Sequence, residues 1–165
     1  MKKLYIIGGT MGVGKTTVCQ QLKKVLAKSV FLDGDCCWDM QPFVVNEETK
    51  AMVIKNICFL LNQFLHCSVY ENIIFCWVLH QQDIIDTILN SLDTTNCELA
   101  IISLLCNANT LNARLDKDIR EGIRSNDVIE RSVGRIPLYD NLSTEKIITD
   151  GKSVDDIVKE IVDKF

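Results

Sequence analysis

The feature that most constrains this chain of 165 residues is a stretch of eight, at positions 9–16, directly after a short apolar run. It reads GTMGVGKT and fits the pattern G-x-x-x-x-G-K-[ST] at every fixed position. Glycines at these places let successive backbone N–H groups curl around an anion, and the helix that starts next adds a favourable dipole. A chance glycine-rich turn is the alternative, but it does not account for the strand-like run before the loop and the amphipathic pattern after it. The stretch therefore predicts a phosphate-binding loop that holds a nucleoside triphosphate.

The residues of this loop have distinct predicted roles. Lys15 can reach the β- and γ-phosphates, and we expect it to act in catalysis as well as in binding. The Thr16 hydroxyl can complete the ligand shell of Mg²⁺. We expect the nucleotide to contact the loop and the residue after it, namely Gly9, Thr10, Met11, Gly12, Val13, Gly14, Lys15, Thr16 and Thr17.

Apolar runs and amphipathic stretches alternate along the whole chain, which predicts a single α/β domain over residues 1–165. The runs predict strands at 4–7, 30–32, 73–79, 99–105 and 146–149. Helical spacing of apolar residues predicts helices at 15–27, 47–65, 83–92, 110–118, 127–138 and 154–162. The runs are continuous, as is typical of parallel strands buried on both faces. In such sheets ligands bind at the carboxyl ends of the strands, so chemistry is expected just after each run.

Charge and composition exclude several classes of protein. A net charge of −4 and a pI near 5.2 argue against a general nucleic-acid or membrane-surface binder. No apolar run reaches the roughly 18 residues that a membrane-spanning helix needs, and the N-terminal run is too short for a signal peptide. The eight cysteines contain no C-x-x-C pair, so we expect reduced thiols and a cytoplasmic protein. A zinc site remains an alternative, using Cys36, Cys37, Cys67, His66 or His80.

Two carboxylates follow the second predicted strand. Asp33 and Asp35 flank a glycine at the mouth of this strand, where they would lie near the γ-phosphate. We predict that Asp35 is the general base and that Asp33 contacts the metal or the substrate, although the two roles could be exchanged. An ordinary acidic turn is the alternative. The third predicted strand has no acid until Asp83, so either this pair holds the metal or the protein binds nucleotide and catalyses poorly.

Aromatic residues near the strand ends are candidates for an acceptor pocket. Trp38, Phe43, Trp77 and His80 all come shortly after predicted strands. Large aromatic side chains often pack in a core instead, and a histidine without a visible partner is often structural. We therefore expect Trp38, Trp77 and His80, together with Asp33 and Asp35, to contact the substrate, with core packing as the alternative for the aromatic residues.

All five arginines lie between positions 114 and 135, mixed with acidic residues. A break is predicted between two helical pieces, at Gly122 and at Ser125, Asn126 or Asp127, which could cap the second piece. Such a segment, at about residues 114–140, suits a lid that closes over phosphates. We expect Arg120 and Arg124 to neutralise the transferring phosphoryl group, with Arg131 and Arg135 as further candidates. A solvated helix with ion pairs is the alternative.

Together, the phosphate loop, the Asp-Gly-Asp turn, the arginine segment and the turn at 149–153 resemble the P-loop kinases of small molecules and nucleotides. Within that group the Asp-Gly-Asp turn looks like that of adenylylsulfate kinase and chloramphenicol phosphotransferase-like proteins. The resemblance implies a three-layer P-loop NTPase fold with the strand order 2-3-1-4-5, and ATP with Mg²⁺ as the phosphoryl donor. It also implies that Arg114 packs on the adenine, that Gly151 and Lys152 form the adenine-side loop, and that Arg120 and Arg124 belong to the lid.

These observations lead to two hypotheses for function. The first is an ATP-dependent phosphotransferase that moves the γ-phosphoryl group to a small-molecule or nucleotide acceptor. The second is a catalytically weak nucleotide-binding or regulatory module, which would explain the absent third-strand acid. A GTPase is disfavoured because the chain has no N-K-x-D or D-x-x-G motif. We expect a monomer or homodimer with no nucleic-acid or membrane partner.

Overall fold

A parallel sheet of five strands forms the centre of the computed structural model, which describes residues 1–125 and 127–165. The strands lie in the order β2-β3-β1-β4-β5, which confirms the predicted topology. Their bounds are β1 (Lys2–Gly8), β2 (Ser29–Asp33), β3 (Asn72–Cys76), β4 (Cys97–Leu105) and β5 (Glu145–Ile148).

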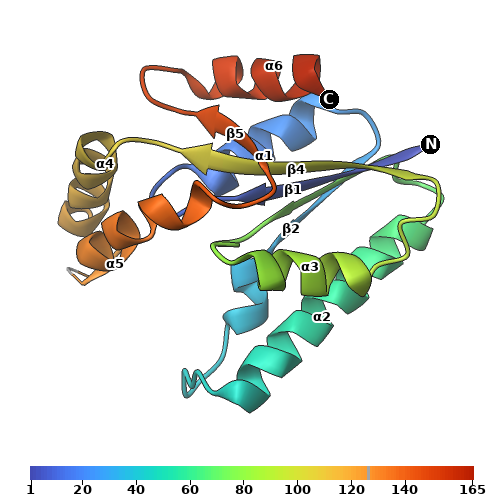
Figure 1. Cartoon of the computed structure of the whole chain (residues 1–165), viewed down its shortest axis with the longest axis horizontal. Helices are drawn as coiled ribbons and strands as arrows, with labels where there is room; N and C mark the ends of the chain where they lie inside the picture. The colour runs from blue at the N-terminus through green and yellow to red at the C-terminus, as the bar shows by residue number, and fades with distance from the viewer. Residues whose placement is uncertain (126) are drawn as a thin grey trace.

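Helices cover both faces of the sheet, so the molecule has three layers. Figure 1 shows α1 and α6 on one side of the sheet, α2 and α3 on the other, and α4 and α5 beyond the arrowhead of β4. The helices are α1 (Lys15–Val25), α2 (Glu47–His66), α3 (Gln82–Asn90), α4 (Ala108–Arg120), α5 (Val128–Gly134) and α6 (Val154–Lys164), with 3-10 helices η1 (Gly34–Trp38) and η2 (Ile136–Tyr139).

Two apolar clusters hold the layers together, one on each face of the sheet. Alternate residues of β1 divide between them: Leu4 and Ile6 pack with α2 and α3, whereas Tyr5 and Ile7 pack with α1, α4 and α6. All four of these side chains are buried. The predicted burial of the strands on both faces is therefore confirmed, and it follows from the period of two in a strand.

Three local predictions need correction. The third strand ends at Cys76 rather than at residue 79, because Leu79 adopts φ +43°, outside the extended region. The helix predicted over 127–138 is two pieces, α5 and η2. The second begins at Ile136 and has Pro137 in its first turn. The 3-10 helix η1 was not predicted, although the Asp33 side chain caps it by accepting from the Asp35 N–H.

The start of α5 tests part of the predicted capping. Asp127 is the N-cap residue, but its side chain makes no capping hydrogen bond, and the Ser125 hydroxyl donates to its carboxylate instead. The alternative cap at Asn126 lies outside the described residues. Over residues 1–125 and 127–165, no helix has the length and apolar character that crossing a bilayer requires.

Candidate functional site

The phosphate loop has the geometry that its glycines predict. Gly12 has φ +83°, and a Cβ at this position would lie 2.6 Å from Leu115 Cδ2 on α4. Gly14 has φ +104°, and its carbonyl accepts from the Val18 N–H at 3.0 Å in the first turn of α1. Glycine is required at both places, because an L side chain rarely adopts these angles. The loop therefore turns tightly enough for its backbone N–H groups to face an anion at the start of α1.

Lys15 lies within this loop and folds back over it. Its Nζ donates to the Thr10 carbonyl at 3.0 Å. Burial lowers the pKa of the Lys15 ammonium, and the negative charges of Asp35 and Asp33 oppose that shift. Because a buried cation is stabilised by a nearby anion, phosphate oxygens at this position would strengthen the charged form of Lys15.

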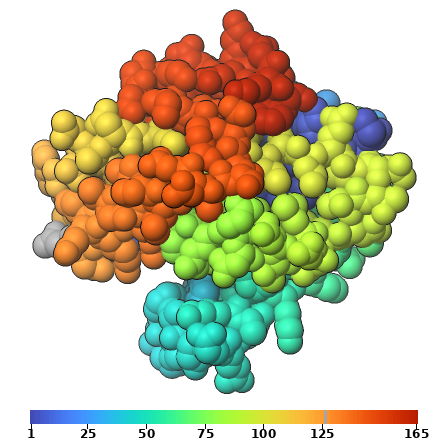
Figure 2. Space-filling view, viewed as in Figure 1, coloured from blue at the N-terminus to red at the C-terminus, as the bar shows by residue number. Residues whose placement is uncertain are grey.

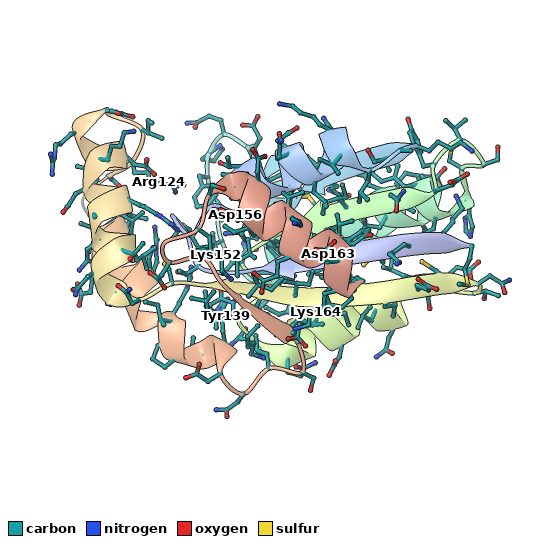
Figure 3. All side chains as sticks on the ribbon, turned by 90° about the horizontal axis from the view of Figure 1, so that it is seen from above. Arg124, Tyr139, Lys152, Asp156, Asp163 and Lys164 are labelled. Atoms are coloured by element: carbon teal, nitrogen blue, oxygen red, sulfur yellow. The ribbon has the colours of Figure 1, made fainter. Side chains whose placement is uncertain are left out.

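A first cavity of about 410 Å³ lies over the loop. Its wall includes Lys117, Asp118, Arg114, Arg124, Lys152, Val154 and Ile157 as well as Asp35 and residues 11–18. In Figure 3, Arg124 and Lys152 lie beside the gap between α4 and α6, and both belong to this wall. The predicted nucleotide contacts Met11 to Thr17, Arg114 and Lys152 are therefore brought together. The other predicted contacts, Gly9, Thr10 and Gly151, are sequence neighbours of residues that line this cavity but do not line it themselves.

Three cations of this wall, Arg114, Arg124 and Lys152, have close contacts. Arg114 donates from Nη1 to the Val13 carbonyl at 3.0 Å and to Thr149 Oγ1 at 3.1 Å, so it ties the loop to the turn after β5. Arg124 pairs with Asp118 at 2.9 Å. Lys152 pairs with Glu160 on α6 at 2.5 Å. The cavity is consequently rich in positive charge that is already held in place, as phosphate binding requires.

Oxygen donors suited to a hard cation lie at the edge of the loop. Thr16 Oγ1 donates to Asp33 Oδ2 at 2.8 Å, which links the start of α1 to the end of β2. A hydroxyl and a carboxylate are the ligand types that Mg²⁺ prefers. The residues present therefore fit the metal that the sequence predicts. Over residues 1–125 and 127–165, no group of three or more His, Cys, Asp or Glu side chains is placed to hold a metal ion.

A second cavity, of about 680 Å³, adjoins the first. Its wall is formed by Met11, Asp33, Asp35, Cys36, Trp38, Asp39, Phe43, Val45, Trp77, Arg131 and Arg135. Figure 2 shows α5, in orange, and the segment before α2, in cyan, on either side of a recess in the outline of the molecule. Asp35 and Met11 line both cavities. The Asp35 carboxylate therefore stands where the contents of the two cavities can meet.

The predicted acceptor residues fall partly inside this second cavity. Trp38, Phe43 and Trp77 line it, whereas His80 belongs to the described wall of neither cavity. The Nδ1 of His80 is buried and has no hydrogen-bond partner among the described residues. Burial lowers the pKa of His80, and the charge of Arg135 adds to this effect. His80 therefore lies outside both walls, and its predicted contact with the substrate stays a prediction.

The arginines divide differently from the prediction. Arg124 lines the first cavity, while Arg120, exposed at the end of α4, lines neither. Arg131 and Arg135, the weaker candidates in the sequence, line the second cavity. Lys117, Cys36, Asp39 and Val45 also line a cavity and were not predicted. For Lys117 a signal existed, because it lies three residues after Arg114 and so shares its helix face.

The second half of the arginine segment is anchored to the phosphate loop. The Thr10 hydroxyl, which is buried, donates to the Ser132 carbonyl of α5 at 2.8 Å. Val128 and Ser132 are buried as well. Movement of this segment as a lid therefore requires that the loop contact be broken, and such movement stays a prediction.

Comparison with known proteins identifies the class of this fold. The chain belongs to the AAA domain family, whose model matches residues 6–132. Its fold is that of the P-loop kinases, in agreement with the resemblance seen in the sequence. No curated protein sequence matches the chain.

Solved structures with the same fold include several proteins described as kinases. The gluconokinase of Sinorhizobium meliloti 1021 superposes with a TM-score of 0.71 at 15% identity, over 98% of this chain and 90% of the gluconokinase. The tunicamycin resistance protein of Deinococcus radiodurans gives 0.73 at 16% identity, over 99% and 95%. The APS kinase of Mycobacterium tuberculosis, solved with AMPPNP and APS, gives 0.68 at 14% identity, over 98% and 96%.

Proposed function

We propose that this protein is an ATP-dependent phosphotransferase, in which the first cavity holds the nucleotide and the second holds the acceptor. The observation that carries the proposal is the position of Asp35, which lines both cavities. The kinase descriptions of the solved structures with this fold support the same class of reaction.

In this proposal, the residues of the first cavity bind and orient the triphosphate. The backbone of the loop and the Lys15 ammonium hold the β- and γ-phosphates, and Arg124 neutralises charge that develops on the transferring group. Arg114 keeps the loop in shape through the Val13 carbonyl and offers its guanidinium plane to the base. Lys152 closes the opposite wall, held by Glu160.

Asp35 then acts on the acceptor. Its carboxylate accepts the proton of an acceptor hydroxyl while the oxygen forms a bond to the γ-phosphorus, and the bond from that phosphorus to the bridging oxygen breaks, so that ADP leaves. Thr16 and Asp33 are the residues that would hold Mg²⁺, which neutralises phosphate charge when bound. Since β3 is followed by Trp77 rather than by an acid, Asp33 takes the role of the missing carboxylate.

The test of this function is the Asp35→Asn variant, assayed for both binding and transfer. With γ-labelled ATP and a panel of alcohols and nucleotides, transfer should fall by about 100-fold or more, because general-base catalysis is worth that much. The dissociation constant for ATP with Mg²⁺ should remain nearly unchanged. Asp163→Asn, at the far end of α6 (Figure 3), removes the same charge away from both cavities and should behave as the wild type.

The alternative function is a nucleotide-binding module without transfer. The observation in its favour is Cys76, which ends β3 and is followed by Trp77, so no carboxylate lies directly after this strand. If no acceptor in the panel is phosphorylated and Asp35→Asn behaves as the wild type, the phosphotransferase proposal is wrong and this alternative stands.

A further inference from the structure

The second cavity carries a cation that the proposed reaction does not use. Arg135 follows α5 and lines this cavity, and no carboxylate lies within 4.0 Å of it among the described residues. Arg131, on the same wall, is paired only loosely, at 3.6 Å from Asp127. By contrast, Arg124 in the first cavity already holds a carboxylate at 2.9 Å.

Among the described residues, the neighbours that Arg135 influences most clearly are neutral groups rather than carboxylates. Its guanidinium lies close enough to act on both His80 and Tyr139. Burial lowers the pKa of His80 and the charge of Arg135 adds to that shift, whereas burial raises the pKa of Tyr139 and the charge of Arg135 opposes it. Tyr139 is fully buried, and its hydroxyl donates to the Val78 carbonyl at 2.6 Å. A guanidinium that is half-buried among neutral groups gains most from an anion that enters with the ligand.

The rest of the wall combines aromatic and apolar side chains with three carboxylates, those of Asp33, Asp35 and Asp39. Trp38 and Phe43 stand with ring centroids 6.0 Å apart at an interplanar angle of 51°, and Trp77 packs against Gly34. Phe43 is 66% exposed, far more than a core aromatic residue would be. Exposed and tilted rings at the edge of a cavity suit contact with a flat apolar ligand.

From these contacts we infer that the acceptor is an anionic aromatic or heterocyclic alcohol, whose anionic group binds Arg135 while its ring packs on Trp38, Trp77 and Phe43. The inference rests on the proposed function for the role of the acceptor hydroxyl, which reaches Asp35. The planar guanidinium fits a carboxylate, a phosphate or a sulfate equally, in two parallel hydrogen bonds. The cavity volume of about 680 Å³ is within the range that small-molecule ligands occupy.

The chain provides a direct probe of this cavity. Its two tryptophans, Trp38 and Trp77, both line the cavity, so intrinsic tryptophan fluorescence reports on this cavity. The first cavity is saturated with a non-hydrolysable ATP analogue and Mg²⁺. Three probes are then titrated: 4-(hydroxymethyl)benzoate, its neutral methyl ester, and 4-(hydroxymethyl)phenyl phosphate. The two anionic probes distinguish a carboxylate from a phosphate as the preferred group.

Wild-type protein should bind at least one anionic probe about tenfold or more tightly than the neutral ester. Arg135→Gln should abolish that preference while leaving affinity for the ester and for the ATP analogue unchanged. Arg135→Lys should retain part of it, because the charge stays while the planar fork is lost. Lys55→Gln, which removes a positive charge from the exposed side of α2 outside both cavities, is the control and should keep the full preference. A thermal unfolding curve checks that each variant is folded.

Three results would overturn the inference: equal binding of ester and anions by the wild type, an unchanged preference in Arg135→Gln, or no fluorescence response to any probe at millimolar concentration. Weaker binding of the ATP analogue in Arg135→Gln, with the probe preference intact, would show instead that Arg135 contacts the phosphoryl donor. None of these outcomes depends on turnover. Loss of transfer in the presence of normal probe binding would contradict the proposed function and leave the anionic acceptor site standing.

Discussion

The two cavities that share Asp35 are built in opposite ways. The first takes much of its wall from one unbroken stretch, residues 11–18, and its cations are already tied to carbonyls or carboxylates. The second gathers its wall from separate segments between Met11 and Arg135, and Arg135 has no carboxylate partner among the described residues. A binding site for the triphosphate can be formed by one short stretch of the chain and held rigid. A site for a particular acceptor depends instead on side chains that the fold brings together.

The largest effect on phosphoryl transfer is expected from removing one cation of the first cavity, Lys15. Lys15→Ala should reduce phosphoryl transfer by about 100-fold or more, since a preorganised cation that faces developing charge is worth this much. The assay is release of labelled phosphate or transfer to an acceptor. The fluorescence response to the anionic probes should persist, because Lys15 does not line the second cavity.

Lys24→Ala is the matched control for this variant. Lys24 is exposed on the same helix, α1, and belongs to neither cavity. It should transfer phosphate at the wild-type rate. Loss of probe binding in Lys15→Ala would show that the two cavities are not separable, and the comparison between them would fail.

A smaller effect, confined to the second cavity, is expected from Gly34→Ala. A Cβ at Gly34 would lie 2.7 Å from Trp77 Cγ, so the indole must move. We expect a loss of about 1–3 kcal/mol in the free energy of unfolding, as is usual for overpacking, together with a changed tryptophan emission. Affinity for the ATP analogue should be retained, which isothermal titration calorimetry can measure.

Gly12→Ala provides the converse change. Its Cβ would meet Leu115 on α4 beneath the phosphate loop, at a φ of +83° that an alanine rarely adopts. This variant should weaken binding of the ATP analogue while leaving the tryptophan emission as in the wild type. If both variants impaired both ligands equally, the cavities would behave as one site.

The smallest effect is expected from the titration of His80. Burial and the charge of Arg135 lower the pKa of His80 in the folded protein, below the ordinary value of 6.5. The folded state therefore disfavours the proton, so the contribution of His80 to stability is complete above pH 6.5 and is lost as the pH falls through its folded pKa. In His80→Gln, chemical denaturation should show a shallower loss of stability below pH 6.5 than in the wild type. Identical pH profiles would contradict this account.

Much of the first site could be predicted from the sequence, and so could many side chains of the second, among them Asp33, Asp35 and Trp77, but not which arginines join them. The backbone conformation of the phosphate loop could be predicted from residues 9–16, because it depends on the positions of the glycines and on the helix that follows them directly in the chain. The sheet order followed from resemblance, and the buried strands followed from continuous apolar runs. Arg131 and Arg135 could not be ranked above Arg120, since Pro137 splits the expected helix and the cavity wall depends on where α5 packs.

The central claim is that the γ-phosphate of the nucleotide and the acceptor meet at Asp35. A crystal structure with a non-hydrolysable ATP analogue and Mg²⁺ tests it most directly. We predict that the γ-phosphate lies at the boundary of the two cavities beside Asp35, and that Thr16 Oγ1 has turned from Asp33 to the metal at roughly 2.1 Å. A γ-phosphate directed away from Asp35, with the hydrogen bond between Thr16 and Asp33 still in place, would contradict the claim.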